Sequence, residues 1–203
     1  MNSTAGLGLF IGVCHFDFCI FKTKSLPLAN VYTPPPRTLM EIFENLPEGT
    51  FAQLINNQIV MSPAPSNTHQ KVLDKIYREL GNFVEKHSLG ETRPAPFDVF
   101  LNRKNAYQPD IIFIANSNMD NLKENGFYGA PDLVIEVHSP ATEQHDRGVK
   151  KEVYEKTGVK EYWMIDPVTK MAEGCYLENN AFLPLNGGVG IMNLKLIDLV
   201  LRF

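Results

Sequence analysis

The stretch PDLVIEVHS, residues 131–139, contains an almost uninterrupted apolar run that holds one carboxylate, Glu136. A similar run, QPDIIFI at residues 108–114, carries Asp110 immediately before its apolar part, and EYWMI at residues 161–165 is predicted as another strand. Nearly continuous apolar runs are typical of strands that are covered on both faces of a sheet. These stretches therefore predict buried strands of one α/β domain.

Two predicted helices supply the layers around these strands. Residues 68–87 place apolar side chains at helical spacing, so that one face of the helix packs on a sheet, and Ser66 or Asn67 is the expected N-cap. Residues 142–157 form the second helix, which is expected to end at Gly158. The order of the elements predicts an α/β sandwich built on a mixed sheet that is flanked by helices.

Shorter elements are predicted at both ends of this core. A short helix covers about residues 38–45, and a β-hairpin covers residues 51–62. The tail, about residues 170–203, is predicted to form C-terminal β-hairpins with turns at Asn179–Asn180 and Gly187–Gly188.

Length and composition bound the domain organisation. The chain has 203 residues, of which 44% are hydrophobic, and this suits one globular domain with an appended segment. Three prolines, Pro34 to Pro36, form a stiff spacer. We therefore predict an N-terminal extension and Pro-rich linker at residues 1–37 and a single domain at residues 38–203. The net charge of −4 counts against a tight non-specific DNA binder.

The N-terminal apolar run and the cysteines bear on localisation. Residues 6–21 are too few to span a membrane as a helix, and they include Asp17, which would be costly in lipid. The three cysteines, Cys14, Cys19 and Cys175, form no CxxC pair, so they indicate neither a disulfide framework nor a zinc site. These features predict a cytoplasmic chain without a membrane partner.

Two carboxylates lie in the apolar strands, Asp110 at the start of one and Glu136 near the end of another. Burying an unpaired carboxylate costs several kcal/mol, so such groups are usually paired or hold a metal. If the two strands are neighbours, both carboxylates stay ionised together only when a cation joins them, and oxygen ligands favour Mg²⁺ or Mn²⁺. The alternative is that each carboxylate is an edge residue that binds a neighbouring loop.

The second predicted helix carries Asp146, Lys150 and Tyr154 four residues apart, so these side chains line one face. One interpretation is a surface ion pair that contributes a few tenths of a kcal/mol. The other places the Lys150 ammonium beside a metal pocket, where it would orient a water molecule and offset charge in a transition state. The residues alone leave both open.

Two histidines have a similar ambiguity. His69, at the start of the first long helix, is either a site residue or a polar residue at the end of a helix. His138 is two residues beyond Glu136, so strand alternation predicts that it projects to the same side and borders the site.

Taken together, four motifs resemble the Uma2-like family of restriction endonucleases, within the PD-(D/E)XK nuclease superfamily. They are QPDIIFI, then GAPDLVIEVHSPAT, then Asp146-x3-Lys150-x3-Tyr154, and then GVKEYWMIDP, with MSPAPSNTHQ before the first long helix as further support. The resemblance covers about residues 38–178 and implies a restriction-endonuclease-like mixed β-sheet flanked by helices, with a metal site at splayed strand ends.

The resemblance also assigns roles. Asp110 matches the PD aspartate and Glu136 matches the (D/E) position of the next strand. The usual superfamily lysine would stand at position 138, where this chain has His138, and Lys150 matches a lysine that has moved to the following helix. Asp110, Glu136 and the main-chain carbonyl of Val137 are the implied metal ligands, and Lys150 is the implied third catalytic residue.

The implied activity is that of a Mg²⁺- or Mn²⁺-dependent endodeoxyribonuclease that hydrolyses DNA phosphodiester bonds, with DNA as its partner and a homodimer as the candidate assembly. The alternative is a catalytically inactive nuclease-fold module that serves binding or assembly. Two departures from the family pattern favour this alternative, because Gln53 and Gln58 stand where the first hairpin of the family usually has glutamates.

These assignments predict a geometry. The Asp110 and Glu136 carboxylates should lie roughly 4–6 Å apart, within the range where charges perturb one another. The Lys150 ammonium should converge on them, and replacing Lys150 by alanine should abolish cleavage with little change in stability.

Overall fold

The computed structural model describes residues 35–47, 49–139 and 143–203, without the side chain of Gln144. The expected N-terminal extension, residues 1–37, lies outside the described residues except for its last three positions, so the proposed division of the chain stays a prediction. Within the described ranges, no helix is long and apolar enough to cross a membrane.

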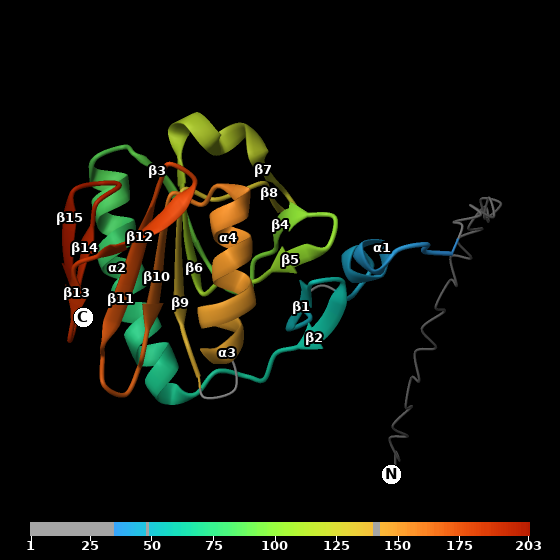
Figure 1. The fold of residues 1–203 in the computed structure, drawn as a ribbon, viewed down its shortest axis with the longest axis horizontal. Helices are drawn as coiled ribbons and strands as arrows, with labels where there is room; N and C mark the ends of the chain where they lie inside the picture. The colour runs from blue at the N-terminus through green and yellow to red at the C-terminus, as the bar shows by residue number, and fades with distance from the viewer. Residues whose placement is uncertain (1–34, 48, 140–142) are drawn as a thin grey trace, which may run out of the picture. The chain divides into compact units, whose positions relative to one another are not determined.

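The three predicted apolar strands are confirmed and lie together in a six-stranded sheet (Figure 1). Its strand order is β12-β11-β10-β9-β6-β3, and only the β9–β10 pair is parallel. The bounds are β3 Gly90–Pro94, β6 Ile111–Ala115, β9 Leu133–Val137, β10 Glu161–Ile165, β11 Ala172–Glu178 and β12 Ala181–Leu185. The strands β6, β9 and β10 occupy inner positions, which explains why their sequences are apolar on both faces.

A second six-stranded sheet has the order β2-β1-β5-β4-β8-β7, and it includes the predicted hairpin. Its bounds are β1 Ala52–Ile55, β2 Gln58–Met61, β4 Val99–Asn102, β5 Asn105–Tyr107, β7 Leu122–Lys123 and β8 Gly126–Tyr128. A three-stranded antiparallel sheet closes the C-terminus, with β13 Gly187–Gly188, β14 Ile191–Leu194 and β15 Leu199–Arg202. The mixed α/β architecture is thus confirmed, although it contains more than one sheet.

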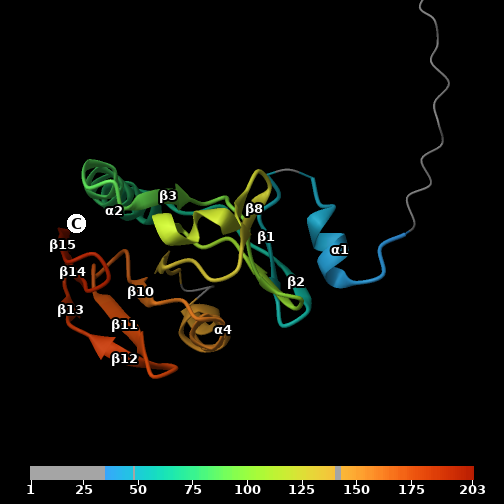
Figure 2. The same cartoon turned by 90° about the horizontal axis from the view of Figure 1, so that it is seen from above.

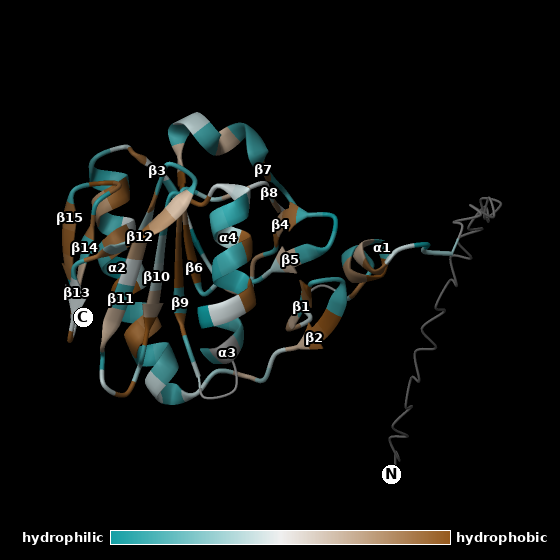
Figure 3. Ribbon diagram, viewed as in Figure 1, coloured by the Kyte–Doolittle hydropathy of each residue, from teal (hydrophilic) through white to brown (hydrophobic). Residues whose placement is uncertain are grey.

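Helices cover both faces of the sheet that holds β9 (Figure 2). The long helix α2, Asn67–Lys86, begins at the predicted cap Ser66, and it packs with the C-terminal sheet on one face. Helix α4, Lys151–Thr157, packs on the other face together with residues of the second sheet. The described residues also form the helices α1 Leu39–Glu44 and α3 Glu143–His145 and the 3-10 helix η1 Asn116–Asn121. Figure 3 shows the apolar colouring concentrated on the strands between these layers.

The predicted second helix has an irregular centre. Residues 143–157 are helical, but Asp146–Lys150 form a π-helical segment, η2, between α3 and α4. Gly158 ends the helix in the left-handed conformation, as expected.

One of the two predicted C-terminal turns is wrong. Asn179 and Asn180 form a turn with positive φ, but Gly187 and Gly188 form strand β13, and the chain turns at Gly190, where φ is +67°. Gly187 is required by packing, because a Cβ atom there would come within 2.2 Å of the Ala172 carbonyl oxygen.

A buried carboxylate joins β10 to the C-terminal segment. Glu161 accepts hydrogen bonds from Trp163 Nε1 at 2.7 Å, Lys195 N at 3.2 Å and Leu196 N at 2.7 Å. These donors satisfy a carboxylate that is otherwise removed from solvent, and they fix the segment that leads from β14 to β15.

We expect Glu161→Ala to lower the free energy of unfolding by roughly 3 kcal/mol, because three donors lose a charged acceptor in the interior. Chemical denaturation provides the measurement. The exposed Glu178 at the end of β11 is the control, and Glu178→Ala should change stability by less than about 0.5 kcal/mol. Equal stabilities of the two variants would contradict this role of Glu161.

We also expect a chain that begins at Pro35 to keep the melting temperature of the full chain within about 2 °C, which corresponds to roughly 0.5–1 kcal/mol for a domain of this size. The reason is that the described residues form three hydrophobic clusters, so the part of the chain that follows Pro34 contains a substantial core of its own. Differential scanning calorimetry of both chains is the measurement. A fall of more than about 5 °C would show that residues 1–34 contribute to the core.

Candidate active site

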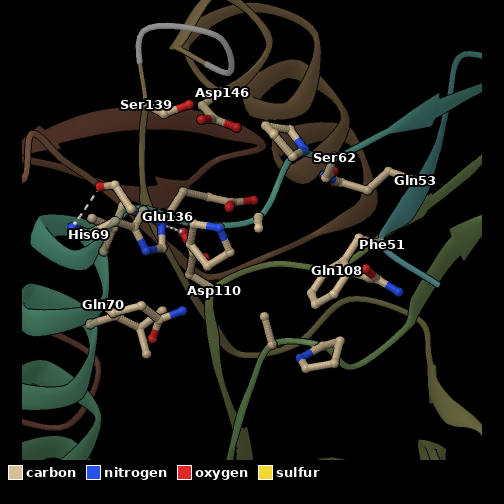
Figure 4. Close-up of a pocket in the computed structure, with 18 of the residues that line it drawn as sticks. Phe51, Gln53, Ser62, His69, Gln70, Gln108, Asp110, Glu136, Ser139 and Asp146 are labelled. Carbon is tan, nitrogen blue, oxygen red and sulfur yellow. Dashed lines mark hydrogen bonds and ion pairs between the residues drawn. The ribbon is translucent and has the colours of Figure 1, made fainter. Parts of the chain in front are cut away.

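The register of β6 and β9 brings the two predicted carboxylates together. Ile111 stands opposite Ile135 in this antiparallel ladder, so one step further along it Asp110 stands opposite Glu136. Both side chains line one cavity of about 360 Å³ (Figure 4). The alternative in which each carboxylate binds a separate loop does not describe this arrangement.

The carboxylate of Asp110 uses one oxygen for contacts within the protein. Its Oδ2 atom accepts a hydrogen bond from Val137 N at 2.7 Å and lies 3.2 Å from His69 Nε2. Among the described residues, none forms a hydrogen bond or ion pair with Oδ1. The side chain is 17% exposed, so this second oxygen is available from the cavity.

Glu136 also uses only one of its two carboxylate oxygens for the contacts that the described residues make. Its Oε1 atom accepts hydrogen bonds from Lys150 Nζ at 3.0 Å and from Tyr154 Oη at 2.9 Å. No partner for Oε2 is found in the part of the chain that the structure describes. Burial raises the pKa of Glu136 to about 8, and the nearby charges of Asp146 and Asp110 add to this effect while Lys150 opposes it.

Lys150 is buried between two carboxylates, so the surface interpretation of this helix face is wrong. Its side chain is 3% exposed, and Nζ lies 3.0 Å from Glu136 Oε1 and 2.9 Å from Asp146 Oδ1. Burial lowers the pKa of the ammonium, but the two carboxylates outweigh it and raise the pKa above its usual value. Lys150 therefore keeps its charge, because it faces Asp146 as well as Glu136.

The π-helical segment contributes to this arrangement. It spans Asp146–Lys150, so the first and last residues of the segment form the ion pair, and the following turn supplies Tyr154 to the same oxygen of Glu136. Segments of this kind are frequent at functional sites. The sequence predicted the shared face of these residues but gave no signal for the π-helical turn.

His69 lies at the site, whereas His138 does not border it. His69 lines the cavity beside Asp110, and its buried Nδ1 atom has no hydrogen-bond partner among the described residues. Burial lowers the pKa of His69, but the hydrogen bond to Asp110, the charge of Asp110 and smaller effects of Val137 and Glu136 together outweigh it, so the pKa rises. His138 is buried away from the cavity, with Nε2 3.9 Å from Glu143 Oε1, because β9 ends at Val137 and its alternation does not extend further.

The two glutamines that depart from the family pattern occupy different environments. Gln53 is buried, lines the cavity, and donates a hydrogen bond from Nε2 to Ser62 Oγ at 3.2 Å. Gln58 is exposed at the start of β2. Only the first substitution therefore changes the candidate site. Residues 62–66 also line the cavity, which the sequence did not indicate.

The donor set fits one hard cation with incomplete protein coordination. No group of three or more His, Cys, Asp or Glu side chains among residues 35–47, 49–139 and 143–203 is arranged to hold a metal ion. Two carboxylates face the same cavity instead, and one oxygen of each has no partner in the described part of the chain. Mg²⁺ usually keeps several water ligands and needs only one or two carboxylates.

Comparison with known families decides the classification. The model of the Uma2 family, described as "Putative restriction endonuclease", matches residues 40–189. The chain belongs to the Uma2 family. A crystal structure from Anabaena variabilis ATCC 29413, described as that of a "putative nuclease belonging to DUF820", superposes with a TM-score of 0.67 and 18% sequence identity. The match covers 82% of this chain and 95% of that chain, which confirms the predicted nuclease-like fold. No curated protein matches the chain.

Because Lys150 is buried in this Uma2 protein, the expectation that its replacement would change stability little no longer holds. We expect Lys150→Met to lower the free energy of unfolding by roughly 3–5 kcal/mol, because it leaves buried carboxylates without their cation. The neighbouring Lys151 is partly exposed, and Lys151→Met should stay within about 0.5 kcal/mol of the wild type. Denaturant titration at neutral pH compares the variants, and a Lys150→Met protein as stable as Lys151→Met would refute the ion-pair assignment.

Proposed function

We propose that this protein is a metal-dependent endonuclease that hydrolyses DNA phosphodiester bonds with Mg²⁺ or Mn²⁺. The observation that supports the proposal most strongly is the different use of the two carboxylate oxygens in both Asp110 and Glu136. Each carboxylate binds protein donors through one oxygen, and the other oxygen has no partner among the described residues that line or surround the cavity. An ion placed there would be held by Asp110 Oδ1 and Glu136 Oε2, with the Val137 carbonyl as the third expected ligand.

Different groups of the protein would orient the metal ligands and stabilise the transition state of such a reaction. A bound divalent ion supplies a Lewis acid and lowers the pKa of a coordinated water. His69 and the Val137 N–H hold Oδ2 of Asp110, so that the carboxylate keeps one orientation. Lys150 carries a fixed positive charge at the cavity, where it would offset the negative charge that develops on the phosphate in the transition state.

A second candidate function is a nuclease-fold module without catalytic activity, which serves binding or assembly. The neutral side chain of Gln53 in the cavity and the net charge of −4 favour it. Under the leading proposal the partner is DNA, the candidate assembly is a homodimer, and the compartment is the cytoplasm.

Cleavage of supercoiled plasmid with millimolar Mg²⁺ or Mn²⁺ tests the leading proposal. We expect Asp110→Asn to reduce the cleavage rate at least about 100-fold, because an amide cannot supply the anionic oxygen and retains only the hydrogen-bonding shape. Lys150→Arg should also fail to cleave the plasmid, since a planar guanidinium does not replace a compact ammonium in a closed pocket. Asp120→Asn, on the exposed helix η1, should cleave like the wild type.

The same preparations distinguish an inactive module from an enzyme with an unsuitable substrate. Mn²⁺ at 100 times its Kd should stabilise the wild type by about 2.7 kcal/mol, and this shift should disappear in Asp110→Asn. A wild type that neither cleaves DNA nor responds to either ion would favour the inactive module.

A further inference from the structure

Gln53 has a buried amide that the protein satisfies only in part. The residue is 7% exposed, on strand β1, and its Nε2 atom donates to Ser62 Oγ at 3.2 Å. Its Oε1 atom is buried and has no hydrogen-bond partner among the described residues. Buried polar atoms without a partner are rare in native proteins, so such an atom at a cavity indicates a ligand or an ordered water.

The unsatisfied amide belongs to the cavity that holds the two carboxylates. Gln53, Asp110 and Glu136 line it together. Figure 4 shows Gln53 reaching in from the β1 side and His69 from the α2 side. A donor that satisfies Gln53 Oε1 would therefore share the cavity with the free oxygens of both carboxylates.

The charges at this cavity suit a single divalent ion. A bound cation favours the ionised form of the carboxylates, and Asp110, Glu136 and Asp146 then carry three negative charges. With one positive charge on Lys150 and a neutral His69, these groups sum to −2. One Mg²⁺ or Mn²⁺ ion balances this charge. A carboxylate at position 53 would add a negative charge, whereas the neutral amide adds an acceptor without disturbing the balance.

We propose that Gln53 is a positioning residue whose Oε1 atom accepts a hydrogen bond from a water molecule bound to the divalent ion. The inference rests on the proposed metal site at Asp110 and Glu136. Mg²⁺ and Mn²⁺ retain water ligands when the protein supplies few, and these waters are strong donors. Groups that bind the ligands of an ion in this way typically change its affinity by about 10- to 100-fold.

Calorimetric titration with Mn²⁺ alone, in the absence of DNA, tests the assignment. Gln53→Met has a similar length and no acceptor, and it should weaken Mn²⁺ binding about 10-fold or more. Gln53→Glu keeps an acceptor and adds charge, so it should bind Mn²⁺ more tightly than the wild type. The exposed Gln58 supplies matched controls, and Gln58→Met and Gln58→Glu should bind like the wild type.

The outcomes separate this inference from the proposed function. If the wild type binds Mn²⁺ and both Gln53 variants bind it equally well, the role of Gln53 is wrong and the metal site stands. If a thermal scan without metal shows that Gln53→Met does not fold, the Mn²⁺ affinity of Gln53→Glu tests the inference instead. An affinity equal to or weaker than that of the wild type overturns the inference. If the wild type binds no Mn²⁺, both the inference and the proposed function fall.

Discussion

The ion pair between Lys150 and Glu136, with Asp146 as the second carboxylate, joins the irregular helix to the centre of the main sheet. A buried pair of this kind adds little net stability, because the cost of removing charges from water offsets their attraction. The effect of the ion pair is to specify one position of the helix on the sheet. Any packing of the helix that moved Lys150 away would leave charged groups unpaired among apolar side chains, so the helix has one acceptable position on β9.

The residues of the main sheet were predictable because their environment imposes a simple rule. Strands β6, β9 and β10 are covered on both faces, and this selects the apolar runs by which they were recognised. The carboxylates were conspicuous for the same reason. Glu136 interrupts an apolar run and Asp110 directly precedes one, so the burial of each carboxylate needs a compensating partner.

Other features depend on contacts between distant segments, which local patterns do not encode. The burial of Lys150 follows from the packing of its helix on β9, and an exposed ion pair has the same i, i+4 spacing. Gly187 looks like a turn residue in sequence, but the close approach of the Ala172 backbone is what requires it. Gln53 reaches the cavity only because its hairpin belongs to a second sheet, and His138 leaves it because β9 ends one residue earlier.

The candidate site draws its groups from segments far apart in the chain: Gln53 on β1, His69 on α2, Asp110 before β6, Glu136 on β9 and Lys150 in η2. Its last member follows about three quarters of the sequence, and strand β10, beside β9, comes later still. A nascent chain that has emerged from the ribosome only as far as β9 carries both carboxylates without the ammonium that pairs with Glu136. The candidate site is consequently a late product of synthesis, because Lys150 joins the chain only after both carboxylates have been added.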